Sequence, residues 1–309
     1  MSVDPAAGYP QYADTDIAYI PQLYAPATLV KYYAKSVVAA ISNTKYEGQI
    51  KDKGDKVIIR TRPTITIRPY TKGQKLTSET PESAPIEMLI DQADYYDFVI
   101  DEVDDKQADI VLSNEFTDDA SEQMRIKIDT KVLGGAYADA HARNQGASAG
   151  VISQNYNLGS TGAPLAVTKN NVIEVLTLIG TVLDEQNAPE EGRKVVVPAW
   201  FRYLIMNSDL KNASITGDSR SIQRNGRVGE VDRLTLFMSN LLATTLDGTT
   251  TVTNIIGCQM DALSFATQLV KNRSFEAQDT FGRRYNGLQV YGYKTVKPEG
   301  MVWLYAYKG

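Results

Sequence analysis

Residues 46–102 have the pattern of one long β-hairpin, and this feature limits what the chain can fold into. Residues 64–68 (Thr-Ile-Thr-Ile-Arg) alternate strictly, and alternation resumes with Ile86, Met88 and Ile90 after a polar tip that contains Lys72-Gly73 and two prolines. An isolated two-stranded hairpin is only marginally stable in water. The sequence therefore predicts that these arms lie on a surface that the hairpin itself does not provide.

A long helix is predicted to follow the hairpin, from Thr117 to Arg143. Its apolar stripe has i, i+4 spacing: Met124, Ile128, Val132, Ala136 and Ala140. Thr117 is the expected N-cap, with Asp118 and Asp119 in the first turn, and the helix would span on the order of 40 Å at 1.5 Å per residue. Gly134-Gly135 in its middle predicts either a closely approaching backbone or a bend.

The remainder of the chain predicts an α+β fold. Residues 24–41 have helical spacing after an extended arm, and Thr168 is the expected cap of a second amphipathic helix that stops before Pro189. A strand at 194–198 and a helix at 199–206 come next, followed by a polar loop at 208–230. The last strands are expected at 234–237, 251–256, 264–270, 288–296 and 301–307.

Charge and composition exclude several classes of protein. The net charge is −5 and the pI is about 5.1, which disfavours a tight nucleic-acid site because such sites gain most of their affinity from cations that displace counterions. No apolar run approaches the roughly 18 residues of a membrane helix, and no secretory signal is visible, so an intracellular product without membrane contact is expected. The single cysteine, Cys258, is predicted to be buried beside Ile255 and Ile256.

Catalytic chemistry has little support in the residues. His141 is the only histidine, it lies near the end of the long predicted helix, and Gly-x-Ser-x-Gly and phosphate-loop motifs are absent. The carboxylates cluster at Asp101, Glu102, Asp104, Asp105, Asp118 and Asp119, but their spacing does not match a calcium loop. We expect no enzyme, cofactor or metal site; a soluble hydrolase using His141 is the alternative.

Several local motifs resemble those of one structural family. Residues 98–108 form an Asp-rich segment with a Gln before the long helix, and Gly-Arg-Val-Gly at 226–229 leads to a β run and Ser-Asn at 239–240. Arg233 stands where a third glycine is usual. The ending has Phe-Ala-Thr-Gln at 265–268, Phe-Gly at 281–282 and Gly-Leu-Gln-Val-Tyr-Gly-Tyr at 287–293.

With the order of elements, these motifs resemble the major capsid proteins of tailed bacteriophages with the Hong Kong 97-like fold. The resemblance implies an N-terminal arm (1–45), an extended hairpin called the E-loop (46–102), and a peripheral domain with the long spine helix (103–207, returning at about 270–299). An axial domain would cover 208–269, with 300–309 adding a strand. The polar loop at 208–229 would line the capsomer axis.

The resemblance also implies partners. Copies of the chain would form pentamers and hexamers and close an icosahedral head around double-stranded DNA, held without sequence specificity. A separate scaffolding protein is expected because only about 45 residues precede the hairpin. A portal protein at one vertex and, in some members, a decoration protein would complete a virion assembled in the host cytoplasm. An encapsulin-type cellular compartment or another virion structural protein is the alternative.

The charged residues suggest how copies meet. The hairpin carries Arg60, Arg62, Arg68, Lys72 and Lys75 in an acidic protein, and the expected acceptors on a neighbour are Asp101, Glu102, Asp104 and Asp105 or the pair Asp118 and Asp119. Opposite charge steers docking and register more than it adds affinity. The simpler interpretation is that these cations only keep a free hairpin soluble. Some family members form Lys–Asn cross-links, and Lys72 and Lys75 are the candidates here, although surface lysines need no such role.

Overall fold

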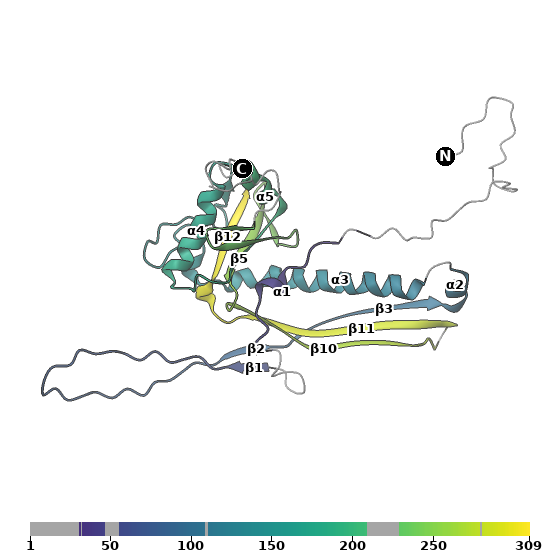
Figure 1. Cartoon of the computed structure of the whole chain (residues 1–309), viewed down its shortest axis with the longest axis horizontal. Helices are drawn as coiled ribbons and strands as arrows, with labels where there is room; N and C mark the ends of the chain where they lie inside the picture. Colours follow the sequence, from purple (N-terminus) through teal and green to yellow (C-terminus); the bar gives the residue numbers. More distant parts are fainter. Residues whose placement is uncertain (1–30, 32, 47–55, 109–110, 209–228, 279) are drawn as a thin grey trace, which may run out of the picture.

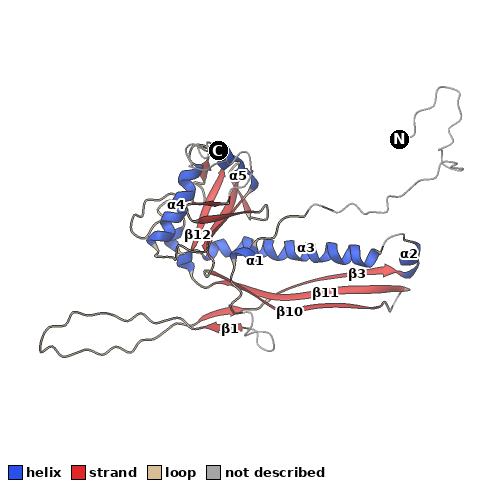
Figure 2. Ribbon diagram, in the orientation of Figure 1, coloured by secondary structure: helices blue, strands red, loops and turns tan. Residues whose placement is uncertain are grey.

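The computed structural model describes residues 31–309 except 32, 47–55, 109–110, 209–228 and 279. Figure 1 shows a compact unit of sheet and helices, a long helix that lies along a narrow sheet, and a hairpin that projects beyond that sheet. Figure 2 shows helices and strands mixed along the chain, which confirms the α+β class. No helix in the described ranges is long and apolar enough to cross a membrane.

The compact unit contains a seven-stranded sheet in the order β4-β12-β9-β5-β7-β6, with β8 paired to β9. Its strands are β4 (Leu165–Val167), β5 (Arg193–Val197), β6 (Glu230–Val231), β7 (Leu234–Met238), β8 (Thr244–Asp247), β9 (Thr250–Gln259) and β12 (Met301–Lys308). The pairs β12–β4 and β5–β7 are parallel, and the other pairs are antiparallel. The strands predicted at 194–198, 234–237, 251–256 and 301–307 are confirmed, with small shifts at their ends.

Helix α4 (Val172–Glu185) packs against this sheet because its apolar side chains recur on one face. Leu176, Ile179 and Leu183 are completely buried. The central strand β9 is buried from residue 252 to its end. Gly257 in β9 allows the helix to approach, since a Cβ there would lie 2.8 Å from Ile179 Cγ2. Burial of this kind stabilises a fold by roughly 25 cal/mol per Å² of apolar surface.

Helices α5 (Ala199–Met206) and α4 differ in how their starts compare with the prediction. Helix α5 has the predicted bounds. Helix α4 begins after Asn171, so Thr168 is not its N-cap as predicted. The amide of Thr168 instead donates to Asn171 Oδ1 at 2.7 Å, which fixes the chain just before the helix. Cys258 is buried as predicted.

The long helix α3 lies on a separate, three-stranded antiparallel sheet in the order β10-β11-β3. Its strands are β3 (Gln92–Asp101), β10 (Leu263–Glu276) and β11 (Gly282–Thr295), which include the strands predicted at 264–270 and 288–296. On β3, Phe98 faces the helix and contacts Phe116 edge to face. Because side chains alternate along a strand, Tyr95 and Val99 point to the other face, where they are 76% and 49% exposed. One face of this sheet is therefore covered and the other is open.

Helix α3 runs from Leu112 to Gly135, so the predicted range of 117–143 is wrong at both ends. Thr117 lies inside the helix, where its hydroxyl donates to Ser113 O at 2.6 Å. After Gly135 the chain continues in two 3-10 turns, η2 (Ala136–Asp139) and η3 (Ala142–Asn144). These turns keep Ala136 and Ala140 buried, which is why the apolar spacing continued beyond the helix. The 24 residues of α3 span about 36 Å at 1.5 Å per residue.

The two glycines end α3 rather than lying in its middle. A Cβ on Gly135 would lie 2.3 Å from the hydroxyl of Tyr293 on β11, whereas Gly134 has open space around it. The predicted close approach therefore exists at Gly135, but it comes from a side chain and not from a backbone.

The hairpin is shorter as a β structure than predicted. β1 (Lys56–Ile59) pairs antiparallel with β2 (Ile86–Leu89), and their buried side chains form a small cluster with neighbours: Val57, Ile59, Met88, Ile90, Ala266 and Val296. Residues 60–85 contain no strand, so the strand predicted at 64–68 is absent in the single subunit. The opposing arm contains Pro81 and Pro85, which cannot donate to a ladder.

The sheets do not follow the predicted division of the chain. The boundary at 207/208 would cut the seven-stranded sheet, because β5 pairs with β7 across it. The predicted hairpin range of 46–102 contains β3, which pairs with β11 and not with β1. The range 208–269 contains the start of β10, which also belongs to the three-stranded sheet. Each structural unit combines segments that are distant in the sequence.

Arg233 occupies a turn that normally favours glycine. Strands β6 and β7 are joined by Asp232 and Arg233, whose φ angles are +49° and +62°. Positive φ at both central residues defines the tight type I′ hairpin turn. The guanidinium of Arg233 pairs with Asp184 at 3.1 Å and with Glu190 at 2.8 Å, and these contacts help offset the cost of the backbone conformation.

Two predictions fall partly outside the described residues. Of the helix predicted at 24–41, the structure describes α1 (Val38–Ile41), and residues 33–37 before it are not helical. The polar loop predicted at 208–229 lies outside the described residues except for its two ends, 208 and 229.

Candidate intersubunit surfaces

The hairpin between residues 60 and 85 is exposed along almost its whole length. Figure 1 shows this segment extending away from the rest of the molecule. Its large apolar side chains are exposed to an unusual degree: Ile65 60%, Ile67 90%, Tyr70 66% and Leu76 82%. Apolar side chains gathered on a projection with no core are typical of a surface that a partner covers.

Side chains, and not a β ladder, hold the two arms of this segment together. The amide of Thr66 donates to Glu79 Oε1 at 2.7 Å, and the hydroxyl of Thr61 donates to Ala84 O at 2.7 Å. Arg68 lies 3.7 Å from Glu79, so one predicted interface cation has an acidic partner within its own chain. All five predicted cations are exposed: Arg60, Arg62, Arg68, Lys72 and Lys75.

The predicted acidic acceptors at 101–105 lie at the far end of the three-stranded sheet. Asp101 is the N-cap of the short helix α2 (Glu102–Gln107), and its Oδ1 accepts from Val103 N at 2.8 Å. Glu102, Asp104 and Asp105 follow in the first turn, where carboxylates complement the helix dipole. All four are exposed and so are accessible to another chain.

The other predicted acceptor pair does not begin a helix, because α3 starts several residues earlier. Asp119 accepts from the hydroxyl of Tyr33 at 2.7 Å and pairs with Lys31 at 3.2 Å. The hydrogen bond from Tyr33, followed by that from Lys31, holds the pKa of Asp119 below its ordinary value. Asp119 therefore binds the arm of its own subunit, and of the pair only Asp118 is exposed.

A buried carboxylate that the sequence analysis did not single out joins the long helix to its sheet. Asp94 on β3 is 6% exposed and accepts from Lys131 on α3 at 2.8 Å and from the hydroxyl of Tyr291 on β11 at 2.8 Å. Lys127 lies 3.3 Å away. Burial alone raises the pKa of Asp94, but these three donors outweigh it and lower the pKa below its ordinary value. Asp94 thus connects three elements of this layer.

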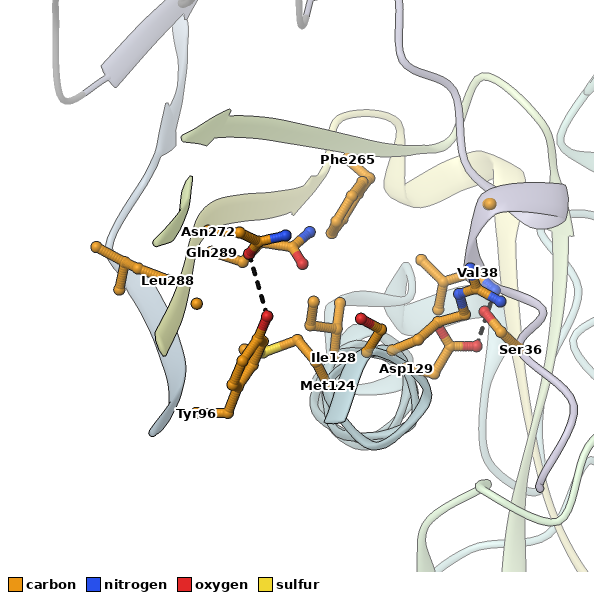
Figure 3. A pocket seen from close by; sticks show the side chains of 14 residues that line it. Ser36, Val38, Tyr96, Met124, Ile128, Asp129, Phe265, Asn272, Leu288 and Gln289 are labelled. Atoms are coloured by element: carbon orange, nitrogen blue, oxygen red, sulfur yellow. Dashed lines mark hydrogen bonds between the residues drawn. The ribbon is translucent and has the colours of Figure 1, made fainter. Parts of the chain in front are cut away.

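A second buried carboxylate, Asp129 on α3, fixes the start of α1. Its Oδ2 accepts from the amides of Val37 at 2.6 Å and Val38 at 3.2 Å. Figure 3 shows Asp129 at one side of a cavity of about 350 Å³ between α3, α1 and the β10–β11 strands. Across the cavity the hydroxyl of Tyr96 lies 3.3 Å from Asn272 Oδ1.

The surroundings of His141 and Cys258 fit structural roles for both residues. His141 precedes η3, where its Nδ1 accepts from Arg143 N at 3.2 Å and lies 3.1 Å from Gln186 Nε2. Burial raises the pKa of the Cys258 thiol to about 12, which keeps it protonated and unreactive. In the described part of the chain, no group of three or more His, Cys, Asp or Glu side chains is placed to hold a metal ion.

Comparison with known proteins agrees with this architecture. A family model described as phage capsid protein matches residues 93–304, more than half of the chain, and the chain therefore belongs to the phage capsid protein family. No match is found among curated protein sequences.

Solved capsid structures have the same fold. A structure from Mycobacterium phage Che8 has 25% identity and a TM-score of 0.75, and the match covers 92% of this chain and 96% of that one. The capsid of cyanophage P-SCSP1u matches over 100% of both chains, with 16% identity and a TM-score of 0.74. The mature capsid of bacteriophage PhiM1 has 14% identity and a TM-score of 0.68, with 94% and 93% covered. Family and neighbours together support a major capsid protein of a tailed phage, as predicted.

Proposed function

We propose that this chain assembles head to tail into pentamers and hexamers that close an icosahedral head around double-stranded DNA. The observation that carries the proposal is the hairpin at 60–85, which exposes Ile65, Ile67 and Leu76 without a core of its own. When another copy covers these apolar side chains, they are removed from water and the contact is stabilised. Head-to-tail contacts close into a ring when a whole number of equal rotations between neighbouring copies makes one full turn.

The two sheets and the hairpin correspond to three parts of a capsid subunit in this proposal. The seven-stranded unit is the axial domain that meets at the capsomer centre, and the three-stranded sheet with α3 is the peripheral domain. The hairpin is the E-loop that lies over a neighbouring copy. Strand pairing supports this grouping, because each sheet combines segments that are distant in the sequence.

Charge supports the hairpin as a clamp between copies. Its acceptors are Asp101, Glu102, Asp104, Asp105 and Asp118, which are exposed. Asp119 is less suitable because Tyr33 and Lys31 already bind it. Each exposed ion pair contributes only about 0–1 kcal/mol, but a shell repeats the contact in every subunit.

Other partners follow from the same role. We propose as partners a separate scaffolding protein, a portal protein at one vertex and a decoration protein. We also propose that the chain assembles in the host cytoplasm and becomes part of the virion. The acidic balance of the chain supports contact with packaged DNA that does not depend on sequence. Proteins of this family are structural, and we propose no catalytic role for His141.

Assembly of the purified chain tests the proposal. We expect sedimentation and electron microscopy to show capsomers or closed shells, with a scaffold required for uniform size. A compact monomer under all conditions would contradict the proposal. Particles that package enzymes rather than DNA would favour an encapsulin-type compartment. The variant His141→Ala should assemble like the parent, whereas a loss of an enzymatic activity in this variant would favour the hydrolase alternative.

A further inference from the structure

Two segments of this chain have opposite and unmixed charge. Residues 60–75 on the first hairpin arm and tip contain five Lys or Arg and no Asp or Glu. Residues 91–105, which include β3 and the start of α2, contain seven Asp or Glu and no Lys or Arg. Within one subunit Figure 1 shows the tip of the hairpin pointing away from the α2 end of this layer. The complementary charges can therefore meet when they belong to different copies.

The basic arm also has an extended backbone that lacks a strand partner. Residues 64–68 have the alternation and β-branched side chains of a strand, but they pair with no strand among the residues that the structure describes. The amide of Thr66 points to the other arm, where it donates to Glu79. Successive amides of a strand point to opposite sides, so with Thr66 turned toward Glu79 the amides of Ile65 and Ile67 would point away from the second arm when residues 64–68 form a strand.

The acidic segment has a matching open edge. β3 is an edge strand of the three-stranded sheet, and within the described ranges it pairs only with β11. Its ten residues leave one row of backbone groups without a strand neighbour. Exposed edges of this length readily accept another strand, and natural proteins protect them or use them.

We propose that residues 64–68 of one copy add as a strand to the open edge of β3 on a neighbouring copy. The proposal rests on the proposed shell function and specifies how the hairpin binds. The amides of Ile65 and Ile67 would pair with the backbone of β3. Arg62 and Arg68 would flank that contact beside exposed carboxylates of this segment such as Asp91 and Asp101, while exposed apolar side chains on the two strands cover each other.

The opposite edge of the same sheet fits this occupant poorly. On β10, Lys271 and Arg273 would face the basic arm with like charge, which disfavours docking. The start of β10 is also occupied, because Asn43 O accepts from Phe265 N at 3.0 Å. The second hairpin arm is a poor substitute for residues 64–68, since its Glu79 and Glu82 would meet the acidic β3 edge.

Amide hydrogen exchange tests this binding mode directly. In the unassembled full-length subunit, the amides of Ile65 and Ile67 should exchange rapidly; in closed shells, their exchange should slow at least tenfold. A purely electrostatic clamp would leave these amides open to water. Closed shells with rapid exchange at Ile65 and Ile67 would overturn strand addition while leaving the shell function intact, whereas a parent chain that never forms shells would overturn both.

Disulfide formation between introduced cysteines identifies which edge of the three-stranded sheet binds residues 64–68. Ile67→Cys would be combined with one cysteine at each position from 95 to 99, and in the control set with one at each position from 271 to 275. The only native cysteine, Cys258, is buried and does not compete. We expect oxidised shells of at least one variant in the β3 set to give ladders of linked subunits on denaturing gels. Ladders from the β10 set alone, or no ladders from shells of either set, would contradict the proposal.

Discussion

The seven-stranded unit and the hairpin use similar residues in opposite ways. Ile179 on α4 is completely buried, whereas Ile67 on the hairpin is 90% exposed. The sheet and helix around Ile179 come from this same chain, but no described segment covers Ile67. The comparison indicates that the subunit obtains its stability in one region and its assembly contacts in another. Substitutions in the two regions should therefore affect different measurements.

The largest effect on subunit stability is expected in the core. Ile179→Ala should lower the free energy of unfolding by about 2–5 kcal/mol, because it removes buried apolar surface and leaves a cavity. The matched variant Ile67→Ala should change it by no more than about 0.5 kcal/mol. Urea unfolding of the unassembled subunit measures both. Equal losses would show that the hairpin packs within its own subunit.

Asp94 should have the next largest effect, because it joins α3 to the sheet beneath it. Asp94→Asn is expected to lower the free energy of unfolding by about 2–3 kcal/mol, since it leaves Lys131 and Tyr291 without their charged acceptor. Asp91→Asn, at the exposed residue just before the same strand, is the control and should cost much less. A loss of equal size in both variants would contradict this role for Asp94.

The lowered pKa of Asp94 also predicts how stability depends on pH. Its contribution should be fully present above the ordinary carboxyl value of 3.8 and should be lost as the pH falls through the lower value of the folded state. Unfolding measured from pH 6 downward should show this loss in the parent chain. Asp94→Asn should remove that part of the pH dependence; an unchanged dependence would exclude Asp94 as its source.

The two regions also differ in how well the sequence predicts them. Helix α4 and the strands β5, β7, β9 and β12 of the compact unit are predicted from their apolar residues, because these side chains are buried within the subunit. The short strands β4, β6 and β8 are not predicted. The alternation at 64–68 predicts a strand, but a strand requires a partner, and no described segment of the subunit provides one. The apolar spacing does not predict the end of α3, because the 3-10 turns that follow the helix continue that spacing.

The buried carboxylates show a further limit of sequence reasoning. Asp94 lies in an alternating strand and Asp129 beside an apolar stripe, so each has a local signal of an acidic side chain near a buried face. Their partners are distant in the sequence: Lys131 and Tyr291 for Asp94, and the amides before α1 for Asp129. Only the tertiary arrangement brings these groups together.

The smallest expected effect concerns single charges on the hairpin. Arg68→Glu should weaken assembly most at low salt, by no more than about 1 kcal/mol per contact, because salt screens exposed charges. Lys169→Glu, an exposed change of the same charge on the compact unit, is the control and should have little effect. Light scattering at several salt concentrations measures both. The same weakening in both variants would indicate net charge and not a specific contact.

Shortening the hairpin tip between Lys72 and Pro81 tests the separation of stability and assembly most directly. The free energy of unfolding of the subunit and the yield and heat resistance of closed shells should be measured on the same preparation. We predict a folded, soluble subunit whose unfolding free energy is within about 0.5 kcal/mol of the parent value and which fails to close stable shells. Shells as heat-resistant as those of the parent chain would contradict the account.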